Sequence, residues 1–360
     1  MSIPWWGPHC RHQEDIMANP HYIMKSCTVF ALTLMTLFGF LVHFENRDLL
    51  QKRSLPQRHL ELRKKVFQQP VNNQTYPAFR HPLAPPYPYP YEFLINQPDK
   101  CNDRTPFLIL LVIGKVHDFE TRHAIRATWG NESNYDVDVL RIFLLGFSSF
   151  ASRRTQMMLE EESEAFRDIV QQDFMDTYYN LTLKTLLGME WVTKFCPNAS
   201  YVIKIDNDLF LNVDYLVHNL LFPELPVREN YFTGYIMANT KPLRSKAYKW
   251  YVPVEVYPND TYPPYCVGPA YVFSADMARK IYDVSQRIRV IPMEDSFMGI
   301  CLYELHITIT PPPWGLFNGN YMEYNRCQFH KLITVHHYTS DQLLKIWPDF
   351  WTLKTLGCSK

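Results

Sequence analysis

The sequence predicts an α/β fold in which helices flank a mainly parallel central sheet. Uninterrupted apolar runs at 107–113, 139–146 and 201–205 are typical of strands that are buried on both faces. The segments between these runs carry apolar residues at helical spacing. Strands that alternate with helices favour parallel pairing, because each helix crosses back over the sheet. We therefore expect one folded domain over residues 101–360.

The segments between the strands predict helices of different character. FETRHAIRATWG (119–130) predicts a helix that ends at Gly130. The glutamate-rich stretch MMLEEESEAFRDIV (157–170) predicts a polar helix, and YYNLTLKTLLGMEWVTKFC (178–196) predicts a largely apolar one. The order strand, helix, strand thus continues through this half of the chain without an internal repeat.

The overall charge excludes one class of function. The chain has 360 residues, of which 36 are basic and 36 are acidic. A protein that binds nucleic acid needs a surplus of positive charge to neutralise phosphates, so we expect no nucleic-acid partner. The sequence carries no signal for an oligomeric state.

The N-terminal region predicts a membrane anchor and a stem. Residues 26–44 contain no charged side chain and come close to the ~20 residues that span a bilayer. No small-residue cleavage site follows, so we interpret this stretch as an uncleaved signal anchor, with a buried core helix as the alternative. Residues 1–25 are then a cytosolic tail. Residues 45–100 are polar and then proline-rich (HPLAPPYPYPY, 81–91), which predicts an extended stem.

Cysteines and glycosylation signals orient this anchor, since the lysines and arginines on its two sides do not. Six of the eight cysteines follow the anchor, an even number that fits three disulfides in an oxidising lumen. Five N-x-S/T sequons follow it as well, so we expect a lumenal body. The sequons lie at Asn73, Asn131, Asn180, Asn198 and Asn259.

The positions of the lumenal cysteines along the predicted strand order suggest which of them pair. Six cysteines allow many other pairings, and these stay open at this point. The pairs that we expect are Cys101–Cys196, Cys266–Cys301 and Cys327–Cys358.

Two carboxylates follow a buried strand in YVIKIDNDLFLN (201–212). Ligands of open α/β sheets bind beyond the carboxyl ends of strands, where Asp206 and Asp208 are expected. Residues two apart in a strand point to the same side, so both carboxylates can face one divalent cation. Hard oxygen ligands suit Mn²⁺ or Mg²⁺ holding a diphosphate. The preceding strand strengthens a motif that is weak when it stands alone.

Two further clusters contain residues that could act in catalysis or metal binding. Each of them could instead have a purely structural role. Glu294 and Asp295 open a predicted helix in MEDSFMGICLYEL, where acidic residues are also favoured for helix stability alone. His336 and His337 close an apolar strand in LITVHHY. A histidine at a strand end is often a structural residue rather than a ligand.

These segments together resemble a known family. In order they are FLILLVI, RHAIRATWGNES, RIFLLG, DTYYNLTLKTLLGMEWV, YVIKIDNDLFLN, YFTGY, KWY, YVFSADMA, EDSFMGICL and LITVHHY. The chain is similar over residues 92–358 to the Golgi β-1,3-glycosyltransferases, and most of all to their β-1,3-galactosyltransferase branch. The resemblance implies a glycosyltransferase-A-type fold, a UDP-sugar donor, an inverting reaction and a type II Golgi membrane protein.

The resemblance also implies roles for individual residues. Asp206 and Asp208 match the motif for metal and diphosphate, with Asn207 at its variable middle position on the donor side. His336 matches the histidine that completes the metal site, and His337 beside it is the less favoured ligand. The remaining matches are Arg122, Arg126 and Trp129 for the nucleotide pocket, Asp295 for the general base with Glu294 beside it, and Trp250, Tyr251 and Gly268 for a donor and acceptor loop.

The chemistry that the resemblance implies fits these residue types. The acceptor hydroxyl loses its proton as it attacks the anomeric carbon, and a carboxylate within hydrogen-bond reach can take that proton. UDP needs no protonation when it leaves if a metal neutralises its charge. We therefore expect transfer of galactose from UDP-galactose to the 3-hydroxyl of a terminal N-acetylglucosamine on glycoprotein or glycolipid glycans.

One stretch departs from the family pattern and leaves alternatives for the function. The family has SGTGYVFSGD where this chain has VGPAYVFSAD (267–276), and EDVY where it has EDSF. Pro269 removes an amide donor, Ala270 adds a methyl group, and Val267 replaces a hydroxyl. The alternatives are another donor, such as UDP-N-acetylglucosamine, and an inactive lumenal homologue that acts as a binding or partner subunit.

Overall fold

The computed structural model describes residues 91–148 and 151–352. These residues belong to the second of two compact units of the chain, Ala78–Lys360. No helix within the described ranges is both long and apolar enough to cross a bilayer. The predicted tail, the signal anchor, Asn73 and the stem up to residue 90 lie outside the described residues.

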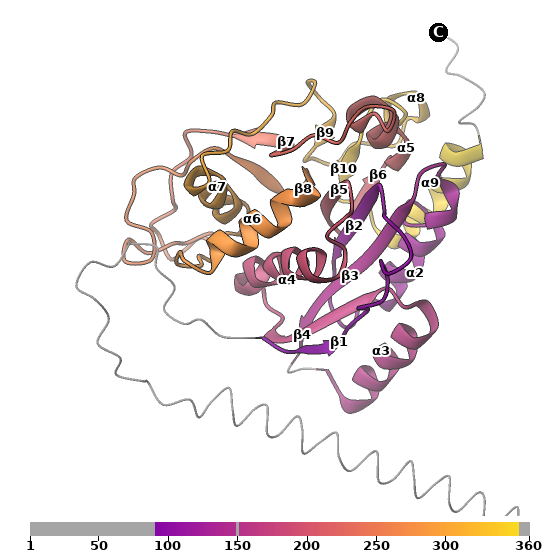
Figure 1. Cartoon of the computed structure of the whole chain (residues 1–360), viewed down its shortest axis with the longest axis horizontal. Helices are drawn as coiled ribbons and strands as arrows, with labels where there is room; N and C mark the ends of the chain where they lie inside the picture. The colour runs from indigo at the N-terminus through magenta and orange to yellow at the C-terminus, as the bar shows by residue number, and fades with distance from the viewer. Residues whose placement is uncertain (1–90, 149–150, 353–360) are drawn as a thin grey trace, which may run out of the picture. The chain divides into compact units, whose positions relative to one another are not determined.

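A seven-stranded sheet forms the centre of the domain (Figure 1). Its strands are β1 (Phe93–Ile95), β2 (Leu108–Ile113), β3 (Val139–Phe147), β4 (Ile169–Met175), β5 (Tyr201–Asp206), β7 (Phe232–Met237) and β8 (Tyr265–Ser274). Their order in the sheet is β1-β4-β3-β2-β5-β8-β7. The four inner neighbours β4, β3, β2 and β5 are parallel, whereas β1 and β8 run antiparallel to their neighbours. The prediction of a mainly parallel central sheet is therefore confirmed.

Helices cover both faces of this sheet, as predicted. Figure 1 shows α4, α6 and α7 on one side and α2 and α9 on the other. Strand β2 explains how one strand serves two cores, since Ile109 and Leu111 pack on the first side and Leu108 and Leu110 on the second. The helices are α2 (Phe119–Ala127), α3 (Arg153–Phe166), α4 (Leu181–Phe195), α5 (Val213–Leu216), α6 (Ala275–Ser285), α7 (Glu294–Glu304), α8 (Arg326–Phe329) and α9 (Ser340–Thr352).

A small second sheet completes the region around the end of β5. It contains β6 (Leu209–Leu211), β10 (Thr334–His336) and β9 (Phe317–Asn318) in the order β6-β10-β9. Strand β6 follows β5 after a turn of two residues and pairs antiparallel with β10. The small sheet therefore brings the segment that ends at His336 next to the turn that follows β5.

Two element boundaries differ from the prediction. The helix predicted over 157–170 ends early, because Arg167 adopts a left-handed backbone with φ of 51° and β4 follows. Two buried glutamines hid that strand from a hydrophobic pattern. Gln171 donates to the Gly146 carbonyl at 3.0 Å, and Gln172 donates to a carboxylate at 2.7 Å. The folded region also begins before residue 101, since β1 pairs with β4.

The three predicted disulfides have different outcomes. Cys101 and Cys196 are bonded, with their Cα atoms 5.3 Å apart, so this pair is confirmed. The Cys266–Cys301 prediction is wrong, because both are free and buried. Both pack in the apolar core as small hydrophobic residues, and burial raises the pKa of each thiol above its ordinary range. Cys327 is disulfide-bonded, and Cys358, its predicted partner, lies outside the described residues.

Candidate active site

The site lies where β5 ends. The parallel pairing of β2 with β5 places Ile113 opposite Asp206, so the two strands end at the same edge of the sheet. The antiparallel pairing of β6 with β10 places Leu209 opposite His336. Asp208 lies between these two pairings, and its carbonyl accepts from the Tyr338 amide at 2.8 Å. The turn after β5 and the end of β10 are thus fixed side by side.

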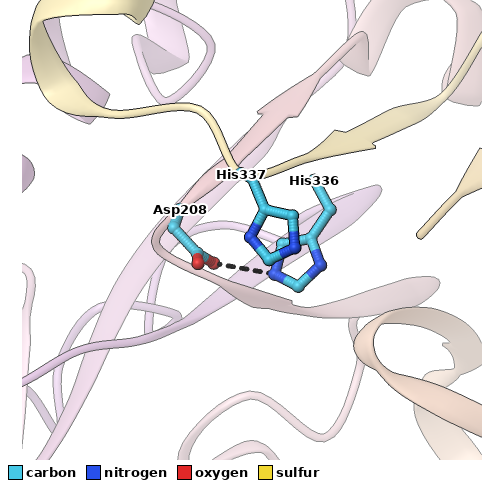
Figure 2. Close-up of side chains that lie close together, drawn as sticks. All are labelled: Asp208, His336 and His337. Carbon is cyan, nitrogen blue, oxygen red and sulfur yellow. Dashed lines mark ion pairs between the residues drawn. The ribbon is translucent and has the colours of Figure 1, made fainter. Parts of the chain in front are cut away.

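Asp208, His336 and His337 form a group that can hold a metal ion, which we call the metal group. Each offers one ligand atom, and these atoms lie within 4.8 Å of one another. His336 Nε2 lies 3.3 Å from Asp208 Oδ1, and Figure 2 shows the two side chains pointing toward one another. His336 Nδ1 lies 3.2 Å from the Gly319 carbonyl, to which it donates. With Nδ1 engaged in this way, Nε2 is the nitrogen that would offer its lone pair to a metal once its proton is lost.

His337 joins this group through its backbone conformation. Its φ of 66° lies in the left-handed region, which a histidine adopts less readily than glycine. Its ring stacks on that of His336, with 3.8 Å between the centroids, as Figure 2 shows. The sequence favoured His336 over His337, and the structure brings both to the site.

The interaction between Asp208 and His336 favours the ionised form of the Asp208 carboxylate, which is the form that binds a cation. Partial burial opposes ionisation of Asp208, but the hydrogen bond and charge of His336 outweigh it and lower the pKa of the carboxyl group. For His336, burial opposes protonation, but Asp208 outweighs it and raises the pKa of the imidazole. A divalent cation supplies the same attraction to Asp208 and would take the place of that proton.

Asp206 lies outside the metal group, although the sequence paired it with Asp208. Its Oδ1 accepts a hydrogen bond from Lys204 Nζ at 2.6 Å. Burial raises the pKa of Asp206, and Lys204 opposes that change. The two carboxylates of the motif thus have different partners, Lys204 for the first and His336 for the second.

Asn207 links the motif to the loop that follows β2. Its Nδ2 donates to Asp118 Oδ2 at 2.8 Å, and the same oxygen accepts from the Lys115 amide at 2.9 Å. Gly114 at the end of β2 lies next to the side-chain amide of Asn207, since a Cβ on it would be in ordinary contact with Asn207 Nδ2 at 3.9 Å. The middle residue of the motif therefore fixes the loop beside the site.

The resemblance assigned three residues to the nucleotide pocket, Arg122, Arg126 and Trp129. In the structure, their polar groups form hydrogen bonds and ion pairs with other residues of the chain. Arg122 is fully buried, donates to the Lys115 carbonyl at 2.7 Å and pairs with Glu162 at 2.6 Å. Arg126 pairs with Glu162 and with another buried carboxylate. Trp129 is buried and donates to the Leu209 carbonyl at 3.0 Å. These contacts support the loop after β2 and the start of β6, and direct nucleotide contact stays a prediction.

Glu294 and Asp295 form an acidic pair at the start of α7. Glu294 is 6% exposed, and its Oε1 accepts from the Tyr271 hydroxyl at 2.5 Å and from Thr185 Oγ1 at 3.0 Å. Burial raises the pKa of Glu294 to about 6. Asp295 is less buried, and its Oδ1 accepts from the Ser296 amide at 2.7 Å. Burial raises the pKa of Asp295 as well.

The segment that departs from the family pattern is a bulge of β8 beside this pair. Gly234 of β7 pairs with Tyr271 and Ile236 pairs with Cys266, so β8 has three more residues than β7 between these positions. Pro269 lies in this bulge, where a missing amide donor costs no pairing with β7. Ala270 is 3% exposed and packs in the core, so its methyl group does not enlarge a wall of the site.

An exposed aromatic cluster lies within electrostatic reach of the acidic pair. Trp250 is 47% exposed, and its Nε1 donates to the Tyr178 hydroxyl at 2.8 Å. Lys249 Nζ lies 5.3 Å from the ring of Tyr178 and 4.8 Å from that of Trp250. Burial raises the pKa of the Tyr178 hydroxyl, and the charges of Asp295 and Asp206 add to this effect. The sequence pointed to Trp250 and missed Tyr178, which comes from the segment before α4.

The four described sequons differ in exposure. Asn198 and Asn259 are exposed. Asn131 and Asn180 are half-buried and have local hydrogen bonds, Asn131 Oδ1 with the Ser133 amide and Asn180 Nδ2 with the Met175 carbonyl at 2.8 Å. Glycan attachment at any of the four stays a prediction.

Comparison with known proteins gives one consistent result. The galactosyltransferase family model matches residues 120–313. The chain is 45% identical over 276 residues to "Beta-1,3-galactosyltransferase 2" of Mus musculus, covering 76% of this chain and 65% of that protein. It is 43% identical over 272 residues to "Beta-1,3-galactosyltransferase 1" of Mus musculus, covering 75% of this chain and 82% of that protein. The chain thus spans less than two thirds of the length of the first of these relatives.

Similarity to solved structures is weaker. The apo structure of the WbbM bifunctional glycosyltransferase aligns with a TM-score of 0.36 and 12% identity, covering 69% of this chain and 51% of that one. The alignment to the sequence relatives is much closer, and family membership rests on those relatives.

Proposed function

The chain belongs to the galactosyltransferase family, and from this premise we propose that it is an inverting β-1,3-galactosyltransferase. It transfers galactose from UDP-galactose to the 3-hydroxyl of a terminal N-acetylglucosamine on glycoprotein or glycolipid glycans. One observation carries the proposal. A metal group and an acidic pair flank the end of one strand, and the buried Lys204 pairs with Glu294 of the acidic pair and with Asp206, which begins the turn that carries Asp208.

The donor set of the metal group fits a divalent cation. It combines a carboxylate, an imidazole whose tautomer is set by a carbonyl, and a second imidazole. Asp208 and His336 would hold Mn²⁺ or Mg²⁺, with His337 beside them. The bound cation would neutralise the diphosphate charge of the donor.

Asp295 is the general base in this proposal. It is the more exposed member of the acidic pair, and one carboxylate oxygen is engaged by the following amide. Glu294 already accepts hydrogen bonds from Tyr271 and Thr185, so it supports the start of α7. A base with a raised pKa takes the proton of the attacking hydroxyl more readily than an ordinary carboxylate.

The acceptor side is assigned to the aromatic cluster of Tyr178 and Trp250. Exposed aromatic rings beside a base offer a flat apolar surface with polar edges, which suits a sugar ring. The hydrogen bond between the two side chains fixes their relative orientation. Tyr251 and Gly268 complete the loop that the resemblance assigned to donor and acceptor.

The setting of the enzyme is also a proposal. The uncharged stretch 26–44, the confirmed Cys101–Cys196 disulfide and the exposed sequons support a single-pass type II protein with a lumenal catalytic domain in the Golgi membrane. Peptide mapping of glycans at Asn198 and Asn259 tests this orientation, since a body on the cytosolic side would carry none.

A transfer assay tests the activity. The full-length chain in detergent is incubated with Mn²⁺, an aryl β-N-acetylglucosaminide and UDP-galactose, UDP-N-acetylglucosamine or UDP-glucose in parallel. The expected product is a β-1,3-linked galactoside, identified by linkage-specific galactosidase digestion. A product from UDP-N-acetylglucosamine alone would contradict the donor, and no product from any donor would favour the inactive homologue.

A further inference from the structure

Lys204, in the middle of β5, has a buried amino group with three partners. The residue is 3% exposed. Its Nζ lies 2.6 Å from Asp206 Oδ1 and 3.8 Å from Glu294 Oε2, and it donates to the Gly268 carbonyl at 2.5 Å. A buried ammonium group costs several kcal/mol in desolvation, so it persists only with partners of this kind. These partners come from β5, from the bulge of β8 and from the start of α7.

Through these contacts Lys204 joins the two functional halves of the site. Asp206 begins the turn that carries Asp208 of the metal group. Glu294 immediately precedes Asp295. The backbone at Gly268 lies beside the acidic pair, since a Cβ on this glycine would lie 3.4 Å from Glu294 Oε2 and 3.9 Å from Asp295 Oδ2. Without the ammonium group, the half-buried Asp206 and the buried Glu294 would have no counter-charge between them.

We propose that Lys204 is a positioning residue for sugar transfer, which fixes the acidic pair at a set distance and orientation from the metal turn. The proposal rests on the proposed function. Lys204 itself exchanges no proton and touches no reacting atom. It acts through Asp206, through the Gly268 carbonyl and through Glu294. A donor with its diphosphate at the metal turn has its anomeric carbon near the base only while this distance is kept.

The chain offers a matched control in a second buried lysine. Lys184 of α4 is 1% exposed and also holds a glycine carbonyl and an aspartate, with Nζ 2.5 Å from the Gly114 carbonyl and 2.7 Å from Asp176 Oδ1. Gly114 approaches Asn207, so Lys184 supports the metal turn from the side of the β2 loop. Among the hydrogen bonds and ion pairs of the described residues, its amino group has no partner in the acidic pair.

The two lysines therefore predict different kinetic effects in the full-length chain. Lys204→Met should lower kcat by about 10²-fold, because a displacement of about 1 Å at the base has that cost. Its Kd for UDP with Mn²⁺ should stay within about threefold of wild type. Lys184→Met should weaken UDP binding more than it lowers kcat. The kinetics use UDP-galactose, and titration calorimetry gives the Kd values.

Two results would overturn the proposal. One is a normal kcat in Lys204→Met. The other is an equal loss of kcat and UDP affinity, which would show a general collapse of the site. If the single variant does not fold, Lys204→Met with Glu294→Gln restores charge balance and is compared with Glu294→Gln alone. A double variant with no further loss of kcat would also overturn the role of Lys204.

Failure of the proposed function gives a separate result. The wild-type chain then transfers no sugar, and binding alone tests Lys204. UDP-galactose should bind the wild type more tightly than UDP does, and Lys204→Met should lose this difference while Lys184→Met keeps it. A variant that retains the difference contradicts the role of Lys204. A wild type without any difference contradicts both proposals.

Discussion

The metal group and the acidic pair lie at the two ends of one site, and their surroundings shift the pKa values of their carboxyl groups in opposite directions. The Asp208 side chain is 50% exposed, and His336 lowers its pKa. In the acidic pair, burial raises the pKa of Asp295, the proposed base, and raises that of Glu294 beside it to about 6. A carboxylate that holds a cation has to stay ionised, whereas one that takes a proton works best with a pKa near the working pH. The two environments therefore suit two different tasks.

Lys204 lies between Asp206 and Glu294, and its charge opposes the rise in the pKa of Glu294 that burial causes. Burial opposes the charged form of Lys204, but Asp206 and Glu294 outweigh this and raise the pKa of its amino group. For Lys184, burial dominates over its one ion-pair partner, Asp176, and over the charge of Asp118, and lowers the pKa. A lysine shared between two carboxylates is thus held more firmly in its charged state than a lysine with one. The positive charge of Lys204 therefore belongs to the structure of the site, because it pairs with carboxylates on both sides.

The largest expected effect comes from removal of the metal-side carboxylate. Asp208→Ala should abolish transfer and the Mn²⁺ dependence of UDP binding, and leave the fold intact because the side chain is half exposed. The loss should exceed the about 10- to 100-fold that removal of a metal ligand's supporting partner costs. Circular dichroism checks the fold, and titration of UDP with and without Mn²⁺ checks the site. Full activity of this variant without added metal would remove the metal group from the mechanism.

Removal of the proposed base should have the next largest effect. Asp295→Asn should lower transfer by about 10²–10⁴-fold and leave UDP and Mn²⁺ affinity nearly unchanged, because in the proposed mechanism Asp295 takes a proton that belongs to the acceptor. Glu294→Gln is the matched control and should lose less. Transfer and donor binding are measured for both variants.

A carboxylate that only caps α7 gives a different outcome. Asparagine caps a helix about as well as aspartate, so activity would then survive in Asp295→Asn. Near-normal turnover of this variant would make the acidic pair part of the helix start and leave the base to another residue.

The third effect is a pH dependence of stability. Burial raises the pKa of Glu294 from 4.5 to about 6, so the folded chain binds this proton more tightly than the unfolded chain does. This contribution to stability is fully present below about pH 4.5 and is lost as the pH rises through about 6. The gap between the two values corresponds to about 2 kcal/mol. Glu294→Gln should lack the decline, so its unfolding free energy relative to wild type should rise by that amount.

Urea unfolding of both proteins between about pH 4.5 and about pH 7.5 measures this difference. Titrating groups that do not interact with Glu294 contribute equally to both proteins and cancel in the comparison. A free-energy difference that stays constant with pH would mean that Glu294 is not protonated preferentially in the folded state.

The sequence predicted the elements and the ends of strands better than the contacts between distant segments. The apolar runs predict β2, β3 and β5 because both faces of these strands are buried. Asp208 and His336 were found because each lies at the end of such a run. Lys204 was missed because a polar residue within a strand usually faces water, and its Gly268 partner is 64 residues away.

Contacts between residues far apart in the chain, and burial, also explain the other differences between the sequence prediction and the structure. Tyr178 lies 72 residues from Trp250, so no local pattern joins them. The buried amides of Gln171 and Gln172 broke the apolar pattern of β4 although the strand is internal. Cys266 and Cys301 fitted a count of paired cysteines, but apolar burial explains both without a bond.

The smallest expected effect concerns the departure from the family pattern. Ala270 pairs with Ile205 in the sheet, is 3% exposed and packs in the core, so its methyl group does not face the donor. Ala270→Gly should cost about 1 kcal/mol of stability, through lost burial and greater freedom of the unfolded chain. The ratio of kcat/KM for UDP-galactose to that for UDP-N-acetylglucosamine should stay within about threefold of wild type. Thermal unfolding and competition between the two donors measure these quantities.

Gly268→Ala is the matched change on the other side of the bulge. Its new methyl group would lie 3.4 Å from Glu294 Oε2, at the limit of an ordinary van der Waals contact, and would place an apolar group against the acidic pair, so it should lower transfer more than Ala270→Gly does. A shift of donor preference in Ala270→Gly, with Gly268→Ala unaffected, would reverse this assignment. The wall that selects the donor would then lie at the core side of β8, and the acidic pair would have no part in that selection.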